Sequence, residues 1–258
     1  MPSARADRAR DLIERFRRAR RDHRRAVLEG FHAIKHAIRF QAAIELVCAA
    51  DLDELWALMR QLAPDIEPAL GRLVQSVPPS VLAELAPYPP ETGVIAIAGR
   101  PQADIAAILA ERSAAPVVLL EAPAHLGNVG AVVRAAAAAG AAAVLSTGAQ
   151  DPWHPAALRG SSGLHFALPV ARIDLLPPGD RPLVAIHPDG EPLRAGALPA
   201  RAVLAFGSER RGLSGEMLAA AERQIAIPMR RGVSSLNVAS AVAVILYSWR
   251  LTMGPEFT

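Results

Sequence analysis

The chain has 258 residues, of which 52% are apolar and 21% charged, so it can bury a sizeable core and is not a disordered polypeptide. Its only cysteine, Cys48, excludes an intrachain disulfide and a cysteine-rich zinc site, and we expect no metal ion. Strongly apolar runs of about 18 residues are absent, and the arginine-rich start lacks the apolar segment of a secretory signal. We therefore expect a cytoplasmic protein that does not enter a membrane.

The first 25 residues are strongly basic, because they hold ten arginines against four acidic residues, a local charge of +6. We interpret them as a basic N-terminal arm with a helix over residues 7–20. A stripe of guanidinium groups suits RNA, since binding releases counterions from the phosphates. The candidates for RNA contact are Arg17, Arg18, Arg20, Arg21, Arg24 and Arg25. A solvated terminal helix explains the same charge run equally well.

Residues 26–100 mix the apolar spacings of helices and strands. They predict helices over residues 28–40 and 53–62 and strands over residues 44–48 and 94–98. Prolines at positions 78–79 and 87–90 break any helix around them. We therefore expect a small α/β domain over residues 26–100, followed by a linker over residues 101–115.

From residue 116 onwards, short apolar strands alternate with helices. The predicted strands are residues 117–120, 143–145, 166–170, 184–186, 203–206 and 224–227, and the predicted helices are residues 129–139, 214–221 and 238–251. Uniformly apolar strands that alternate with helices indicate a mostly parallel sheet covered on both faces. Residues 116–258 are therefore expected to form a second α/β domain.

Ligands of such sheets bind beyond the carboxyl ends of the strands, so the loops there are the places to search. In the loop after residues 117–120, Asn128 suits a helix N-cap. Arg134 follows in an otherwise apolar helix, where a buried charge must meet an anion or a carboxylate. A capped helix whose arginine reaches solvent is the plainer explanation of this segment alone.

Two more loops carry polar residues. The loop after residues 203–206 places Glu209 between two glycines, where it answers the charge of Arg134 or binds a polar ligand. Ser214 at its end suits a helix N-cap. The loop after residues 224–227 brings Ser235 and Asn237 to the start of the last helix, where the helix dipole is positive. Capping accounts for only one of them.

The three loops, in this order and spacing, resemble the three motifs of the SpoU branch of the SPOUT RNA methyltransferases. The matching segments are GNVGAVVRAA (127–136), LAFGSERRGLS (204–214) and IPMRRGVSSLNVASAVAVILY (227–247). LRGSSGLHFALPV (158–170) also matches, so the resemblance covers nearly all of residues 116–250. Residues 24–35 are more weakly similar to the start of the small RNA-binding domain that often precedes this catalytic domain.

The resemblance implies a C-terminal trefoil knot, a homodimer, and S-adenosyl-L-methionine as the cofactor. It also implies methyl transfer to a ribose 2′-hydroxyl of RNA. Carried over by motif, the catalytic residues are Asn128, Arg134, Glu209, Ser235 and Asn237. The cofactor-binding residues are Phe206, Gly207, Ile227, Met229 and Leu236.

Two functional questions stay open at the level of the sequence. Arg134 is an awkward general base, because a guanidinium is effectively always protonated, and it is equally suited to hold an RNA phosphate. Ribosomal RNA is the favoured substrate because of the basic start. Transfer RNA, and a non-catalytic RNA-binding protein of the same fold, are the alternatives.

Overall fold

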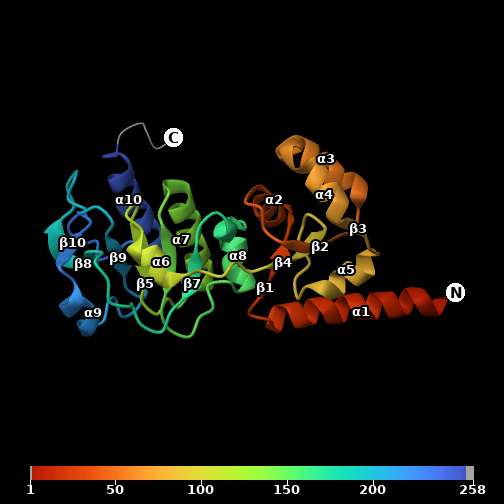
Figure 1. Cartoon of the computed structure of the whole chain (residues 1–258), viewed down its shortest axis with the longest axis horizontal. Coiled ribbons are helices and arrows are strands. Elements are labelled where there is room, and N and C mark those ends of the chain that lie inside the picture. The colour runs from red at the N-terminus through yellow and green to blue at the C-terminus, as the bar shows by residue number, and fades with distance from the viewer. Residues whose placement is uncertain (1, 254–258) are drawn as a thin grey trace. The chain divides into compact units, whose positions relative to one another are not determined.

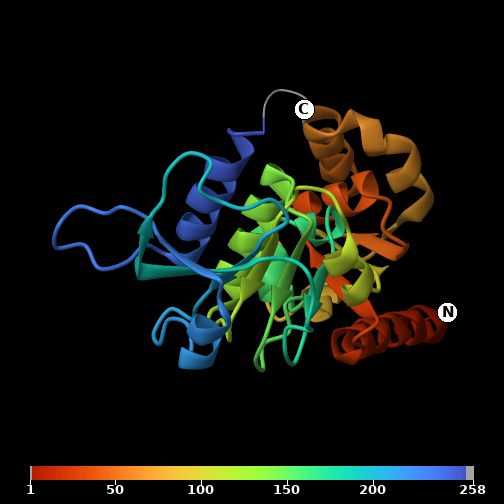
Figure 2. The same cartoon turned by 60° about the vertical axis from the view of Figure 1, so that its left-hand side comes forward.

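The computed structural model describes residues 2–253, with side chains from residue 6 on, and the chain divides into two compact units (Figures 1 and 2). Unit 1 holds the residues up to Pro101 together with Ser162–Ala167. Unit 2 holds Gln102–Ser161 and the residues from Leu168 on. Among the described helices, none combines the length and the apolar character that a membrane crossing requires.

Unit 1 is built on a four-stranded sheet in the order β1-β4-β2-β3. The strands are β1 (Arg25–Glu29), β2 (Ile44–Ala49), β3 (Val74–Ser76) and β4 (Val94–Gly99). The helices are α1 (Pro2–Arg21), α2 (Phe31–Arg39), α3 (Leu52–Leu62), α4 (Glu67–Leu73) and α5 (Pro79–Leu85), with a 3-10 turn, η1 (Pro64–Ile66). β4 runs antiparallel to both of its neighbours, and β2 pairs with β3 in parallel. The expected α/β character of this region is therefore present.

The basic first helix is part of unit 1 and not an arm that precedes it. Ile13, Phe16 and Ala19 recur at helical spacing on one face of α1 and are buried in a core that also contains Val27 and Ile95. The arginines occupy the remaining faces. Because α1 contributes to the core of unit 1, it is neither a solvated helix nor a separable arm.

The helix predicted over residues 28–40 is wrong in its first part. Residues 25–29 form β1, which pairs with β4 from Arg25 to Glu29, and the helix begins only at Phe31. Gly30 turns the chain between them with φ +91°. The proline-rich stretch also contains a helix, because Pro79 occupies the first turn of α5, where a missing N–H costs nothing.

Unit 2 is built on a six-stranded sheet in the order β10-β8-β9-β5-β6-β7, and every pairing in it is parallel. The strands are β5 (Val117–Leu120), β6 (Ala143–Ser146), β7 (Val170–Arg172), β8 (Leu183–Pro192), β9 (Val203–Phe206) and β10 (Arg223–Ala226). The helices are α6 (Ile105–Ala110), α7 (Leu126–Ala139), α8 (Pro155–Ser161), α9 (Gly215–Ala220) and α10 (Val238–Arg250). The predicted parallel sheet is confirmed, and the C-terminal knot stays a prediction.

The strand predicted over residues 166–170 is also wrong. Leu164–Phe166 form a 3-10 turn, η2, within the short segment that belongs to unit 1, and β7 begins only at Val170. Gly163 enters this turn with φ +79°, and a Cβ there would collide with the backbone of Ala33 in α2. Only glycine fits where the two backbones approach this closely, and its positive φ turns the chain out of an extended conformation.

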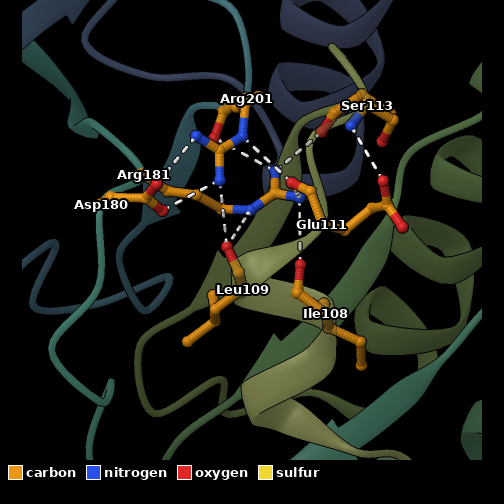
Figure 3. A network of polar contacts seen from close by, with 8 residues as sticks. Ile108, Leu109, Glu111, Ser113, Asp180, Arg181 and Arg201 are labelled. Atoms are coloured by element: carbon orange, nitrogen blue, oxygen red, sulfur yellow. Dashed lines mark hydrogen bonds and ion pairs between the residues drawn. The ribbon is translucent and has the colours of Figure 1, made fainter.

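The predicted linker is folded into unit 2, where a buried arginine holds it (Figure 3). Arg181 is only 6% exposed, and all five of its N–H groups donate to backbone carbonyls. The acceptors are the carbonyl oxygens of Ile108, Leu109, Glu111, Ala115 and Arg201, at 2.9 to 3.1 Å. Carbonyls at the end of a helix lack intrahelical partners, so Arg181 satisfies the end of α6 and ties it to unit 2.

Candidate active site

A cavity of about 600 Å³ lies at the carboxyl ends of β5, β9 and β10 in unit 2. Four segments line it: the start of α7, the middle of β8, the loop between β9 and α9, and the loop between β10 and α10. This is the edge of a parallel sheet at which ligands are expected to bind. The cavity therefore unites the three loops that the sequence singles out.

A chain of hydrogen bonds joins three of the predicted catalytic side chains. One carboxylate oxygen of Glu209 accepts from the Asn128 amide at 2.7 Å, and the other accepts from the backbone N–H of Ala124 at 3.0 Å. The amide oxygen of Asn128 in turn accepts from the Asn237 amide at 3.1 Å. The amide oxygen of Asn237 caps α10 by accepting from the N–H of Ala239 at 2.9 Å. These bonds fix which way both amide groups point.

The carboxyl group of Glu209 is ionised more readily than an ordinary glutamic acid. Partial burial opposes its ionisation, but the hydrogen bonds from Asn128 and Ala124 outweigh burial, and His125 adds a favourable charge interaction. The net result is a pKa of Glu209 below its usual value. Near neutral pH, Glu209 is therefore a hydrogen-bond acceptor already engaged with two donors.

The loop between β9 and α9 is closely braced by its own backbone. Ser208 and Gly212 exchange two backbone hydrogen bonds, at 2.9 and 3.1 Å. A Cβ at Gly207 would overlap the backbone of Gly212 and Leu213, so the loop requires glycine there. Ser214 caps α9, as predicted, through a bond from Met217.

The same loop is also anchored to the end of β5. The backbone N–H and the hydroxyl of Ser214 both donate to the carboxylate of Glu121, at 2.7 and 2.6 Å. Bonds to a carboxylate are stronger than bonds between neutral groups. Hydrogen bonds within the chain therefore hold this wall of the cavity in place without a ligand.

The loop between β10 and α10 is exposed along most of its length. Every residue from Arg230 to Asn237 is exposed, and Figure 2 shows the loop extending away from the rest of unit 2. Val233 and Leu236 expose 48% and 42% of their surface although both are apolar. Exposed apolar side chains beside a cavity are available to cover a ligand.

Nine of the ten predicted site residues line the cavity. The predicted cofactor-binding residues that line it are Phe206, Gly207, Ile227, Met229 and Leu236, and the predicted catalytic residues are Asn128, Glu209, Ser235 and Asn237. The remaining one, Arg134, is exposed on α7 and is not among the lining residues.

Two expectations about α7 are wrong. The helix begins at Leu126 with His125 as its N-cap, so Asn128 lies in the first turn, and its side chain is free to face Glu209. Arg134 is not a buried charge, because α7 packs on α8 and α10 but leaves this position open to solvent. The burial argument for an anion at Arg134 therefore does not apply.

The six arginines proposed for RNA contact divide into two groups. Arg20 pairs with the buried carboxylate of Glu29 at 2.9 Å, and Arg25 pairs with Glu45 at 2.7 Å. Arg18 pairs with Glu14, one turn away in α1. The second group comprises Arg17, Arg21 and Arg24, which are exposed. Part of the basic charge near the N-terminus thus serves the fold of unit 1.

Two histidines that the sequence analysis does not single out also line the cavity. His125 immediately precedes α7, and His187 lies in β8 after the buried residues Val184 and Ala185. A histidine three residues before Asn128, at the mouth of the same loop, is the signal in the sequence that identifies the first one.

Unit 2 is an α/β domain with a parallel sheet and a cavity at the carboxyl edge of that sheet, as the motifs indicate. The model of the SpoU rRNA Methylase family matches residues 115–247. The match spans more than half of the chain, and the chain belongs to this family.

Similar proteins carry related names. The chain is 38% identical over 136 residues to an uncharacterized tRNA/rRNA methyltransferase of Synechocystis, a match that covers 48% of each protein. It is 36% identical over 143 residues to the 23S rRNA (adenosine(1067)-2′-O)-methyltransferase of Streptomyces laurentii, covering 51% of this chain and 52% of that protein. The chain thus spans about half the length of these curated relatives.

The likeness to solved structures extends over both units. The AdoMet-bound rRNA methyltransferase from Sinorhizobium meliloti superimposes with a TM-score of 0.72 over 95% of each chain, at 23% sequence identity. At this level of identity the likeness shows the fold alone.

Proposed function

We propose that this protein transfers a methyl group from S-adenosyl-L-methionine to a ribose 2′-hydroxyl of RNA, with ribosomal RNA as the favoured substrate. The observation that carries the proposal is the hydrogen-bonded chain of Glu209, Asn128 and Asn237 in one cavity of a SpoU-family domain. The names of the similar proteins support RNA as the substrate and ribose as the position. Transfer RNA is the second candidate, because one relative is named for both RNAs.

The cavity has surfaces suited to the cofactor. Ile227 and Leu236 offer apolar contact for an adenine ring, and the bare backbone at Gly207 allows a polar group to approach closely. When bound, the cofactor supplies an electrophilic methyl group. The chain's own part is to align the ribose hydroxyl with that group, and alignment is worth several kcal/mol of barrier. Asn128 and Asn237 present amides of fixed orientation for this purpose.

For Arg134, the phosphate-binding role is the better of the two that the sequence leaves open. A guanidinium has no acceptor for a proton, but at an exposed position it can hold a phosphate with two parallel hydrogen bonds. We therefore assign Arg134 to the RNA backbone and not to proton transfer. Arg134→Lys, which keeps the charge but loses the planar fork, should weaken RNA binding almost as much as Arg134→Ala.

The proposal is tested by methyl transfer itself. The purified chain is incubated with methyl-labelled cofactor and with ribosomal or transfer RNA, and label is expected in ribosomal RNA. Reverse transcription at low nucleotide concentration then stops at the methylated ribose and maps it. Label in transfer RNA alone selects the second candidate. Cofactor binding without transfer to either RNA identifies a non-catalytic RNA-binding protein.

We propose that unit 1 contributes to RNA binding through the exposed arginines of α1 and the segment that follows it. Since α1 carries core residues, point substitutions are a cleaner test than deletion. Arg17→Gln with Arg21→Gln should reduce the slope of RNA affinity against salt by roughly 0.7 to 0.9 for each phosphate that is no longer neutralised. Arg60→Gln with Arg72→Gln, on α3 and α4, is the control with the same change in charge. Equal slopes in the two variants would remove α1 from the RNA interface.

We further propose a homodimer in the cytoplasm, assembled through α10. Val244, Tyr247 and Leu251 follow one another at helical spacing and expose 41%, 43% and 83% of their surface. A row of exposed apolar residues is typical of a protein interface. Light scattering should give twice the mass of the chain for the wild type and a monomer for Val244→Asp.

A further inference from the structure

The proposed reaction needs a group that receives a proton. A ribose hydroxyl is a weak nucleophile and must lose its proton as its oxygen attacks. Among the described residues that line the cavity, three carry a carboxylate or an imidazole: Glu209, His187 and His125. The exposed Arg210 and Arg211 follow Glu209 in the same loop, and a guanidinium has no acceptor for a proton.

Glu209 is poorly suited to this task. Both of its oxygens already accept hydrogen bonds, from Asn128 and from the N–H of Ala124. Those bonds outweigh its partial burial and hold the pKa of Glu209 below its usual value. A carboxylate that is stabilised in its ionised form is a weak base, because its affinity for a proton is reduced.

His187 is partly engaged elsewhere. Its Nδ1 atom accepts from the backbone N–H of Asp189 at 3.3 Å, and the Asp189 carboxylate lies 3.8 Å from the same atom. His187 also comes from β8, whereas the polar cluster is built by the loops that follow β5, β9 and β10.

His125 belongs to the polar cluster by its position. It is the N-cap residue of α7, three residues before Asn128, and its ring makes no capping bond to the helix. The side chain is exposed and lines the same cavity as Glu209 and Asn128. Its ring is thus presented to the cavity that the Glu209 carboxylate also lines.

We propose that His125 is the general base of the reaction, an inference that rests on the proposed function. The ribose 2′-oxygen forms a bond to the methyl carbon as the carbon–sulfur bond breaks. The electron pair of that bond stays on sulfur, which leaves S-adenosylhomocysteine. The hydroxyl proton passes to a ring nitrogen of His125. The imidazolium that forms is balanced by the Glu209 carboxylate and later loses its proton to water.

The first test is the pH dependence of methyl transfer with the full chain. In the wild type, kcat/KM should rise with pH along an acidic limb, because histidine must be neutral to accept a proton. His125→Asn should lower kcat by about 100-fold or more and remove this limb. His187→Asn is the matched control, since it removes the other histidine of the cavity, and it should keep the limb. Cofactor affinity, measured by calorimetry, should change by less than about threefold in both variants.

Two further measurements separate catalysis from a structural role. Added imidazole should restore transfer by His125→Gly, because a free base can occupy the space left by the ring. In NMR spectra, the ring signal that is missing from His125→Asn should shift when S-adenosylhomocysteine is added to the wild type. This second readout does not depend on turnover.

The outcomes are distinguishable. An acidic limb that persists in His125→Asn, or that disappears in His187→Asn, overturns the assignment. Loss of activity in His125→Gly without rescue by imidazole assigns the residue a structural part and also overturns it. A ring signal that does not respond to S-adenosylhomocysteine removes His125 from the loaded cavity. If the wild type binds cofactor but methylates no RNA, the proposed function fails first, and the inference falls with it.

Discussion

The two loops that line the cavity from β9 and from β10 differ in how their conformations are held. In the β9–α9 loop, Ser208 and Gly212 exchange backbone bonds and Ser214 is fastened to Glu121. The β10–α10 loop is exposed from Arg230 to Asn237, and its side-chain anchor is Asn237 at the far end. One wall of the cavity therefore exists before any ligand arrives. The other wall is exposed to solvent, and a bound ligand would cover it.

The largest effect is expected at Gly207, in the braced loop. Gly207→Val should weaken cofactor binding by about 100-fold or more, or roughly 2.7 kcal/mol, because its Cβ would overlap the backbone of Gly212. Calorimetry with S-adenosyl-L-methionine measures this. Gly127→Ala is the control, since a Cβ there has open space. Normal binding by Gly207→Val would mean that the cofactor site lies elsewhere.

A smaller effect is expected at the anchor of the exposed loop. Asn237→Ala removes the cap of α10 and the bond to Asn128, so the free energy of unfolding should fall by about 1 kcal/mol. Ser235→Ala, two residues earlier, changes an exposed side chain and should shift the free energy of unfolding by less than about 0.5 kcal/mol. Urea unfolding of both variants checks the difference, and equal stabilities would show that Asn237 is not the anchor.

The pH dependence of stability reports on the contact between the β9–α9 loop and the start of α7. The pKa of Glu209 is lower in the folded protein, so its ionised form stabilises the fold above the ordinary glutamate pKa of about 4.3. That contribution disappears as the pH falls through the lowered value. The difference in Tm between the wild type and Glu209→Gln should therefore be largest near neutral pH and shrink in acid. A difference independent of pH would contradict the lowered pKa.

The smallest effect is expected at Gly232, in the middle of the exposed loop. Gly232 has φ +90°, so alanine there costs about 1 kcal/mol of backbone strain, but a Cβ would meet no atom within 4 Å. Cofactor affinity of Gly232→Ala should change by less than about tenfold, in contrast to Gly207→Val. Equal losses in the two variants would end the distinction between a braced loop and an exposed one.

Sequence patterns predicted the elements whose identity depends on residues that are neighbours along the chain. Residues 117–120 and 203–206 are strands with the bounds expected, because central parallel strands are uniformly apolar. The loops after them gather at one edge of the sheet for the same topological reason, which brings Asn128 and Glu209 together.

What the patterns missed depends on contacts between distant residues. The spacing of Phe31, Ile34 and Ile38 indicates a helix, but it does not reveal that residues 25–29 pair with β4 instead of extending that helix. Arg134 lies in an apolar run, and this pattern indicates a buried charge. The packing of α7, however, leaves Arg134 open to solvent. His125 lies three residues before Asn128, but the motifs do not include it, because its importance depends on the neighbours that the fold supplies.

Because of the hydrogen bonds of Arg181, the positions around the end of α6 should differ strongly in how well they tolerate mutation. Its five acceptors are backbone oxygens, and every amino acid provides one, so the exposed Glu111 is open to wide substitution. Position 181 itself has no substitute, since lysine carries three donors on one nitrogen and cannot reach five separated carbonyls. In a saturation mutagenesis library selected for folded protein, arginine alone should survive at 181, while position 111 should remain diverse.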